Sequence, residues 1–181
     1  MASKKIFFKN TENYKFEQKD TQIECIGLNT HYKLCLFDHI ALTNCEYFEV
    51  TLKSDNLATL RVGFATKKAE KLAPLGYDNY SWCYQTTNGY GIHNSKINVF
   101  GRRVYKEETI GCLFNRDLKK IFFYINGQKV QKSFNLSEED VNQESFPAIS
   151  CFNSAKCMVN FGPNFGYEDT SKNKQEKKFG V

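Results

Sequence analysis

The stretch RVGFATKKAEKLAPLGYDNYSWCY, residues 61–84, is the part of the sequence that decides the fold. It opens with apolar residues that alternate with Arg61 and Gly63. This two-residue period predicts a β-strand with one buried face. A lysine-rich loop and a turn at Ala-Pro-Leu-Gly follow, and the stretch ends in a cluster of aromatic residues. A strand followed by a long loop that ends in clustered aromatic residues is typical of a sheet that carries a loop over its surface.

The same stretch contains candidates for recognition. Arg61 is expected on the face of the sheet opposite the apolar residues, close to a proline and several tyrosines on the loop. Binding residues tend to lie on loops held by a rigid scaffold, so we interpret this combination as a binding surface. The alternative for each aromatic residue, Trp82 included, is burial in the core. That alternative is weaker for Arg61, because arginine is rarely buried without a partner.

Composition limits the class of protein. The chain has 181 residues, of which 41% are hydrophobic and 25% charged, and this is enough for one domain with a core. Aromatic residues make up 15%, which favours strands over helices. The formal net charge of +5 is mild, and lysines are mixed with acids along the chain. With no arginine-rich helix and no zinc-finger spacing, we expect no direct binding to nucleic acid.

The seven cysteines are an odd number and include no CxxC pair, and the first residues, MASKKIFFKN, lack the pattern of a secretory signal. We therefore expect reduced, mostly buried thiols in an intracellular protein. No apolar run reaches the roughly 18 residues of a membrane helix, so no contact with a membrane is expected. The residues themselves do not distinguish the nucleus from the cytoplasm.

Short strands separated by turns run along most of the sequence. We predict about ten of them, at residues 5–9, 22–28, 32–37, 47–53, 60–64, 109–114, 120–125, 128–134, 147–152 and 156–161. Residues 27–31 are predicted as a hairpin turn, residues 10–21 as a polar loop and residues 89–103 as a long loop with a short strand inside it. Asn126-Gly127 predicts a tight hairpin, and residues 135–145 a capped helical turn or an acidic loop. This pattern predicts an all-β fold, a single-domain sandwich of two antiparallel sheets.

No constellation of catalytic residues stands out. The three histidines lie far apart in sequence, without the spacing of a metal site, and no phosphate-binding glycine loop is present. A pair formed by Cys83 and His93 is the one nucleophilic alternative that can be drawn. We therefore expect a binding module that is not an enzyme, with no cofactor and no metal.

The order of several motifs resembles the SPRY domain, a β-sandwich used for protein recognition. The motifs are EYFEVTL (46–52), RVGF (61–64), LGYD (75–78), TIGCLFN (109–115), IFFYINGQKV (121–130), FPAIS (146–150) and VNFGPNF (159–165). The likeness covers residues 45–167 well and residues 1–44 loosely. It implies one SPRY-like domain over residues 1–167, followed by a lysine-rich tail at residues 168–181.

Within that family, RVGF followed by LAPLGYDNYSW is most similar to the SPRY domain of the Ash-type (absent-small-homeotic) subunit of histone-lysine methyltransferase complexes. The resemblance implies a basic pocket that binds an acidic segment of a WD-repeat partner subunit, and a nuclear location. Carried over by position, the pocket residues are Arg61, Pro74 and Tyr77. Arginine offers a carboxylate a fork of donors, while the proline and the tyrosine form a stiff apolar wall.

One pocket position differs from the family. A second pocket arginine aligns with Gln85, which can still donate a hydrogen bond to a carboxylate but carries no charge. We therefore expect Gln85 to belong to the peptide-binding set and to give a lower affinity for an acidic segment. We expect the chain to be monomeric when alone.

Two other functions stay open. In the first, the chain is a stand-alone SPRY adaptor, cytoplasmic rather than nuclear, that binds another short peptide through loops at the rim of the sandwich. The rim candidates are Tyr90, His93, Arg102 and Arg103. In the second, the sandwich binds carbohydrate through its surface tyrosines, although no cluster of calcium ligands supports this.

Overall fold

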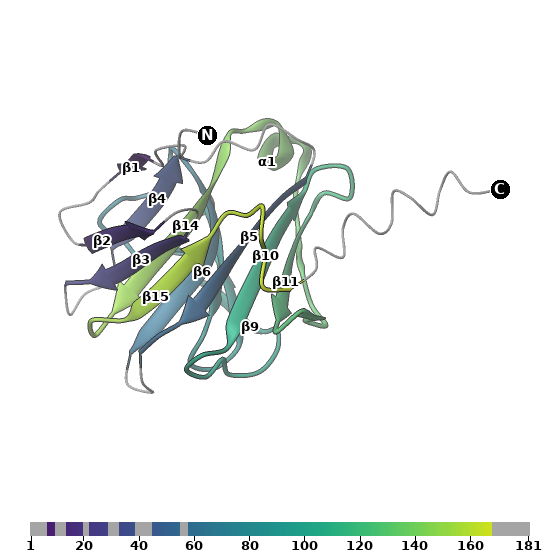
Figure 1. Ribbon diagram of the computed structural model, residues 1–181. Helices are drawn as coiled ribbons and strands as arrows, with labels where there is room; N and C mark the ends of the chain where they lie inside the picture. Colours follow the sequence, from purple (N-terminus) through teal and green to yellow (C-terminus); the bar gives the residue numbers. More distant parts are fainter. Residues whose placement is uncertain are drawn as a thin grey trace.

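The computed structural model describes residues 7–9, 14–19, 22–28, 33–38, 45–54 and 58–167. The described residues form fifteen strands and one short helix, and the strands make two antiparallel sheets stacked face to face (Figure 1). The predicted all-β sandwich is therefore confirmed. The predicted tail at residues 168–181 lies outside the described residues.

The two sheets differ in which strands they use. In spatial order, the seven-stranded sheet consists of β1 (Phe7–Lys9), β4 (Leu34–Asp38), β14 (Ser145–Phe152), β6 (Thr59–Thr66), β7 (Ser81–Gln85), β8 (Tyr90–His93) and β9 (Lys96–Val99). The eight-stranded sheet consists of β12 (Gln128–Lys129), β11 (Lys120–Ile125), β10 (Thr109–Asn115), β5 (Cys45–Leu52), β15 (Lys156–Asn160), β3 (Gln22–Gly27) and β2 (Tyr14–Lys19), with β13 (Phe134–Asn135) paired to β11. Every strand pair is antiparallel.

The core lies between the two sheets and follows from the alternation along β5 and β6. Leu60, Val62 and Phe64 of β6 are completely buried, as the period of two predicts. They face apolar residues of β5, and the rings of Phe48 and Phe64 lie 5.3 Å apart in an edge-to-face arrangement. Trp82 and Tyr84 of β7 also point into this core and are buried. For these two aromatic residues, burial is therefore the correct interpretation.

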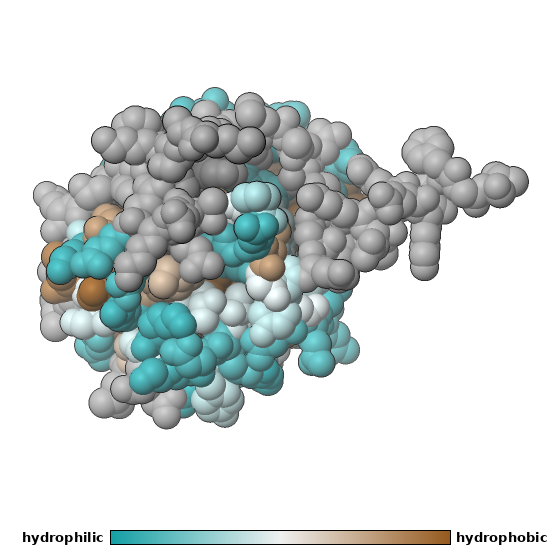
Figure 2. Space-filling model, viewed as in Figure 1, coloured by the Kyte–Doolittle hydropathy of each residue, from teal (hydrophilic) through white to brown (hydrophobic). Residues whose placement is uncertain are grey.

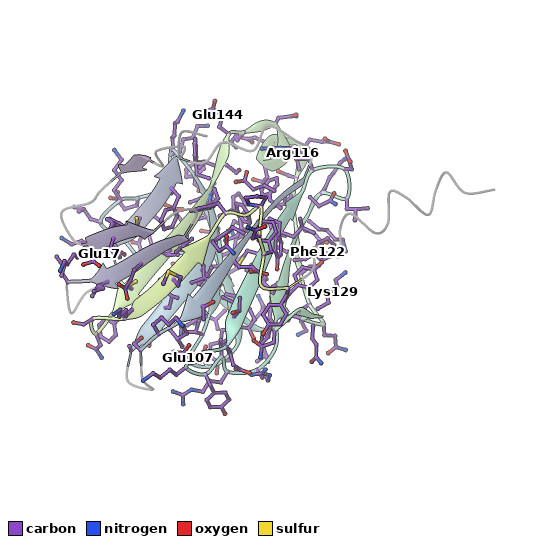
Figure 3. All side chains as sticks on the ribbon, viewed as in Figure 1. Glu17, Glu107, Arg116, Phe122, Lys129 and Glu144 are labelled. Carbon is purple, nitrogen blue, oxygen red and sulfur yellow. The ribbon has the colours of Figure 1, made fainter. Side chains whose placement is uncertain are left out.

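Two tight turns form as their residues predict. Asn126 and Gly127 both have positive φ, 48° and 77°, and close the turn between β11 and β12. The helix α1 (Glu138–Asn142) begins after Ser137, whose side chain and that of Asp140 form a capping box. In Figure 3, Arg116 lies beside α1, where its guanidinium donates to the carbonyl of Val141.

Four predictions about strands and turns differ from the structure. Residues 10–21 are not all loop, because β2 forms over Tyr14–Lys19 and buries Tyr14. The hairpin predicted at residues 27–31 is wrong, because the flanking strands β3 and β4 belong to different sheets. Residues 89–103 contain two strands, β8 and β9, joined by Asn94 and Ser95 with φ of 51° and 56°. The predicted strand at residues 128–134 is also shorter, since it divides into β12 and β13.

Candidate functional site

Arg61 and Gln85 lie next to each other on the outer face of the seven-stranded sheet. They are directly paired between β6 and β7, and both side chains are half-buried. The Arg61 Nε donates to Gln85 Oε1 at 2.9 Å, and its Nη1 donates to the carbonyl of Leu75 at 3.0 Å. Both acceptors are neutral, so these bonds orient the guanidinium without cancelling its charge.

The loop between β6 and β7 covers this outer face, and Leu75 anchors it. The Leu75 side chain is fully buried in a second apolar cluster, together with residues of β4, β8 and β14. Its N–H donates to Ser150 Oγ at 3.0 Å, while its carbonyl accepts from Arg61 and from Cys83 Sγ. Leu75 therefore holds the loop to the sheet and places the Arg61 side chain at the same time.

The LGYD motif makes the loop rigid. Gly76 has φ of +87°, and a Cβ there would lie 2.7 Å from the carbonyl oxygen of Ile92, so only glycine fits without strain. The carboxylate of Asp78 accepts hydrogen bonds from the N–H of Glu70 and Tyr80 and from the Ser81 hydroxyl. Such a network positions the residues beside it with little freedom, which favours binding without a cost in loop ordering.

Pro74 and Tyr77 flank the Leu75-Gly76 dipeptide. The Tyr77 N–H donates to the carbonyl of Pro74 at 3.1 Å, and the Ser95 hydroxyl donates to the carbonyl of Tyr77 at 2.6 Å. The Tyr77 side chain is 54% exposed, and Pro74 is half-buried. The structure therefore places Pro74 and Tyr77 on the loop whose Leu75 carbonyl Arg61 contacts.

Tyr90 belongs with these residues and not with the rim. It pairs with Gln85 across β7 and β8, so its side chain shares the outer face, and Val99 of β9 continues the same row. The row thus runs from Ser150 through Arg61, Gln85 and Tyr90 to Val99. Sequence reasoning missed Ser150, Leu75 and Val99. The places of Ser150 and Val99 depend on the register between strands and that of Leu75 on how the loop packs, and no local pattern reveals either.

The other rim candidates do not form a set with Tyr90. Arg102 makes a bidentate ion pair with Glu108, both N–O distances being 2.7 Å. Arg103 is half-buried, with its guanidinium 5.5 Å from the ring centre of Tyr105. His93 is on the inner side of its sheet, where its ring stacks on that of Trp82 with the centres 5.0 Å apart.

Cys83 and His93 do not form a catalytic pair. Cys83 pairs with Ile92 across β7 and β8, so the side chains of Cys83 and His93 point to opposite faces of the sheet. Burial raises the pKa of the Cys83 thiol to about 12, because its positive neighbour Arg61 only partly offsets the loss of solvation. A thiol with such a pKa is protonated at neutral pH and is a poor nucleophile.

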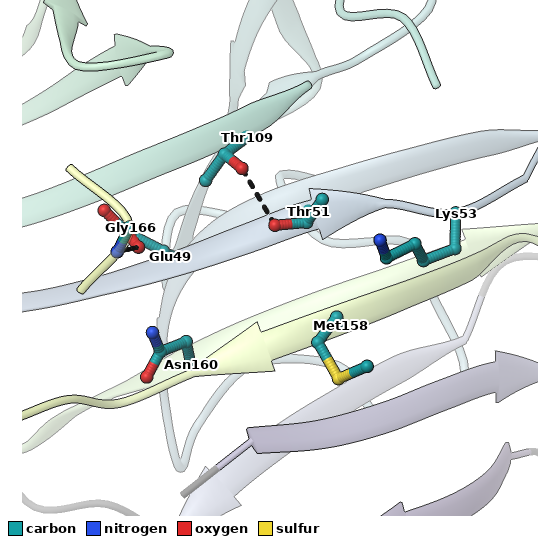
Figure 4. A pocket seen from close by; sticks show the side chains of 7 residues that line it. All are labelled: Glu49, Thr51, Lys53, Thr109, Met158, Asn160 and Gly166. Carbon is teal, nitrogen blue, oxygen red and sulfur yellow. Dashed lines mark hydrogen bonds between the residues drawn. The ribbon is translucent and has the colours of Figure 1, made fainter. Parts of the chain in front are cut away.

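A shallow cavity of about 250 Å³ lies on the outer face of the other sheet (Figure 4). It is lined by side chains of three neighbouring strands and by one glycine: Glu49, Thr51, Lys53, Thr109, Met158, Asn160 and Gly166. Figure 2 shows hydrophilic side chains over much of the lower half of the molecule as seen from this side. The hydroxyls of Thr51 and Thr109 bond to each other at 2.8 Å.

Glu49, at one end of this cavity, has a structural role. Its buried carboxylate accepts from the N–H of Gly166 at 2.7 Å, from the N–H of Tyr167 at 3.0 Å and from the Tyr47 hydroxyl at 3.0 Å. It therefore ties the last described segment of the chain onto the sheet.

Elsewhere on the same sheet, the Lys129 ammonium lies over the ring of Phe122, 3.9 Å from its centre (Figure 3).

The described residues lack two features that would point to other functions. Across residues 7–9, 14–19, 22–28, 33–38, 45–54 and 58–167, no three His, Cys, Asp or Glu residues come together as a metal site would require. In the same part of the chain, no helix is long and apolar enough to cross a membrane.

Comparison with known proteins points to one domain family. The sequence profile of the SPRY domain matches residues 46–164. Among solved structures, the SPRY domain of human HERC1 superimposes with a TM-score of 0.68 and 16% identity, covering 88% of this chain and 100% of that domain. A second human SPRY domain superimposes with a TM-score of 0.60, also at 16% identity.

Three longer proteins share part of their sequence with this chain. A probable ATP-dependent RNA helicase ddx1 of Dictyostelium discoideum is 33% identical, covering 64% of this chain and 14% of the helicase. The Set1/Ash2 histone methyltransferase complex subunit ASH2 of Drosophila melanogaster is 29% identical over 72% of this chain and 31% of that subunit. A Ran-binding protein M homolog of Arabidopsis thaliana is 26% identical over 72% of this chain. The chain therefore spans less than a third of the length of these relatives.

Proposed function

Because this chain belongs to the SPRY domain family, a family of protein-interaction modules, we propose that it is a non-catalytic scaffold that binds a short acidic segment of a partner protein. The peptide site comprises Arg61, Pro74, Tyr77 and Gln85. Tyr90 extends it along the same row of the sheet.

The observation that carries this proposal is the way in which Arg61 is held. Two of its hydrogen bonds, to the side-chain oxygen of Gln85 and to the backbone oxygen of Leu75, set the direction of the guanidinium. A guanidinium held in a fixed direction is preorganised for a carboxylate, since the donors need not be reoriented when the ligand arrives. Tyr77, exposed on the loop that Arg61 contacts, offers an apolar surface to the residues that flank the carboxylate in the peptide.

The finer proposal concerns the partner. We propose that the chain acts as an Ash-like subunit of a histone-lysine methyltransferase complex in the nucleus, and that the acidic segment belongs to a WD-repeat subunit. The likeness to the Drosophila ASH2 subunit supports this, as does the RVGF–LGYD spacing that carries the pocket residues. Gln85 in place of a second arginine predicts weaker binding than a pocket with two arginines would give.

The proposal is tested by replacing Arg61 and measuring binding to a fluorescent acidic peptide from a WD-repeat methyltransferase subunit by anisotropy. Arg61→Ala should weaken binding by about 1.5 to 3 kcal/mol, roughly 10- to 150-fold, because a charge-assisted hydrogen bond is lost. The affinity of the variant should also depend less on salt.

Lys132→Ala is the matched control, since it removes one positive charge from an exposed position beyond β12 on the other sheet. It should change the affinity by less than a factor of about two, as a distant exposed charge is screened. A folded Arg61→Ala protein that binds as tightly as wild type would remove Arg61 from the site.

The alternative function, an adaptor that binds through rim loops, has less support from the geometry. Arg102 already forms an ion pair with Glu108, and His93 faces the inside of the sandwich. A pulldown with Arg102 and Arg103 changed to Glu, compared with the Arg61 variant, separates the two functions. Loss of binding only in the rim variant would favour the adaptor.

A further inference from the structure

The strand β9 ends the seven-stranded sheet and leaves one of its edges open. It has β8 on one side, and no other strand of the described residues pairs with it. All four of its residues, Lys-Ile-Asn-Val, are exposed. Ile97 is 60% exposed and Val99 59%, although both are β-branched residues of the type that strands bury.

The register of the β8–β9 hairpin shows which backbone groups face outward. The two-residue turn Asn94-Ser95 places His93 opposite Lys96, and Phe100 donates its N–H to the carbonyl of Gly89. In an antiparallel pair, hydrogen-bonded and non-hydrogen-bonded residue pairs alternate. Lys96 and Asn98 therefore bond to β8, whereas the N–H and C=O groups of Ile97 and Val99 point away from the sheet.

We propose that this outward edge of β9 receives an extended segment of the partner protein as an additional antiparallel strand. Strand addition supplies backbone hydrogen bonds for affinity and side-chain pairs for specificity. The proposal deepens the peptide-binding function proposed above and rests on it for the identity of the partner. It does not depend on Arg61 for its geometry.

The exposed side chains of β9 define the chemistry of the added segment. Residues opposite Val99 and Ile97 would share the outer face with them and should be apolar. The residue opposite Lys96 should be acidic, since opposite charges across a pair of strands attract. Read from its N-terminus, the antiparallel segment should therefore have an apolar residue, any residue, an apolar residue and an acidic residue. The formal net charge of +5 on this chain also favours an acidic partner.

The new strand lies close enough to the peptide site for one partner to use both. Four strand spacings separate it from Arg61 on β6, roughly 19 Å at about 4.8 Å each. The row through Gln85 and Tyr90 ends at Val99, where the added strand would begin. About six extended residues before the strand would bring an acidic residue to Arg61.

The experiment uses the full chain and a synthetic peptide, DEDGSGSVTVE, that combines both features. Hydrogen exchange measured by NMR should show the amides of Ile97 and Val99 exchanging rapidly in the free protein and at least ten times more slowly with saturating peptide. The amide of Asn98, bonded to β8, should be protected in both states. Unchanged exchange at Ile97 and Val99 with bound peptide overturns strand addition.

Methylated peptides provide the matched control and leave the protein unaltered. Methyl groups on the two valine nitrogens block the amides that face β9 and should weaken binding at least tenfold. Methyl groups on the threonine and glutamate nitrogens, which face away, should have little effect. Equal loss with both patterns would contradict the register.

The failures of the two proposals are distinguishable. If the peptide without DED still protects Ile97 and Val99, strand addition holds without the Arg61 site. If Arg61→Ala abolishes binding while these amides never gain protection, the Arg61 site holds alone and strand addition fails. Protection that grows with protein concentration in the absence of peptide would identify a second copy of the chain as the occupant and overturn the proposal.

Discussion

At the scale of single residues, Gln85 decides how much charge the peptide site carries. Its Oε1 accepts a hydrogen bond from Arg61 Nε at 2.9 Å, so the side chain orients the arginine. An arginine at position 85 would add charge but would lose this acceptor. The site therefore lacks a second positive charge but holds the Arg61 guanidinium in a better-defined direction.

This role predicts a variant that folds but does not bind. Gln85→Glu keeps the shape of the side chain and turns the Arg61 hydrogen bond into an internal ion pair. The ion pair neutralises Arg61 before the peptide arrives, so affinity for an acidic peptide should fall at least about tenfold, as one charge-assisted bond requires. Isothermal titration calorimetry measures the affinity, and thermal unfolding should show a melting temperature no lower than that of wild type.

Gln85→Leu serves as the control for this variant. It removes the acceptor but adds no negative charge beside Arg61, so its affinity should lie between those of wild type and Gln85→Glu. Binding by Gln85→Glu at the wild-type affinity would mean that the charge of Arg61 is not what the peptide recognises.

The sequence could predict which residues carry the chemistry of this site but not how they are arranged. Alternation placed Arg61 on the face opposite the core, and the loop composition placed a proline and a tyrosine near it. Residues 89–103 contain glycines and no clear hydrophobic period, so their sequence alone suggests a rim loop for Tyr90. Only the pairing of β7 with β8 shows that Tyr90 and Gln85 are neighbours.

At the scale of elements, Glu108 connects β10 and the segment before it to the hairpin at Asn126. Its carboxylate accepts from Arg102, from the N–H of Tyr105 and from Asn126 Nδ2. The hydrogen bond from Arg102 is the main reason that the pKa of Glu108 lies below its usual value of 4.5. Such a carboxylate links the stability of the fold to pH.

The sign of this linkage follows from the direction of the shift. A carboxyl group with a lowered pKa in the folded state stabilises it above the pKa of the unfolded state, and this stabilisation is lost as pH falls through the folded pKa. Glu108→Gln should therefore lower stability at pH 7 by less than about 1 kcal/mol, since the Arg102 side chain is 51% exposed. Below pH 4.5 its difference from wild type should shrink. Urea unfolding at pH 7, 5, 4 and 3 measures this.

Glu107→Gln is the control for the pH series. Glu107 pairs with Lys53, but its side chain is 60% exposed, against 21% for Glu108. Its replacement should leave the pH profile close to that of wild type, because an exposed pair contributes little. A profile for Glu108→Gln parallel to that of wild type at every pH would contradict the assigned linkage.

Elements with strong local signals were predictable, and those defined by long-range pairing were not. Asn126-Gly127 and the Ser137 capping box formed as expected, since each depends on neighbouring residues alone. The strand β2 was missed because its polar sequence, YKFEQK, hides the alternation of Tyr14 and Phe16. The predicted β3–β4 hairpin was wrong because the choice of sheet depends on distant partners, β15 for β3 and β14 for β4.

At the scale of the whole molecule, the two outer faces have different uses. The outer face of the seven-stranded sheet carries a half-buried arginine, an exposed tyrosine and an open edge. On the eight-stranded sheet, Glu49 accepts hydrogen bonds from the N–H groups of Gly166 and Tyr167. That part of the outer face is therefore covered by a segment of the same chain. The proposed contacts with a partner therefore all lie on one side of the sandwich.

The buried thiols predict how the sandwich unfolds. Cys35, Cys83, Cys112, Cys151 and Cys157 are reduced and buried, and they come from both sheets. Burial raises the pKa of the thiols of Cys35, Cys83 and Cys112. In native protein at pH 7, these five should react with a thiol reagent only when the fold opens, because the packed sheets cover Cys35, Cys112, Cys151 and Cys157 and the loop anchored by Leu75 covers Cys83.

This prediction is tested by labelling in increasing urea with mass spectrometry to identify each modified cysteine. All five should become reactive over the same range of urea in which the fluorescence of Trp82, the single tryptophan, reports loss of the core. Coincident transitions are the mark of one cooperative unit.

If Cys83 reacts stoichiometrically before Trp82 is exposed, the loop anchored by Leu75 opens separately from the sandwich. Rapid labelling of Cys83 in the absence of urea would further reopen the possibility of thiol chemistry, because that speed requires a stable thiolate which the buried site does not provide.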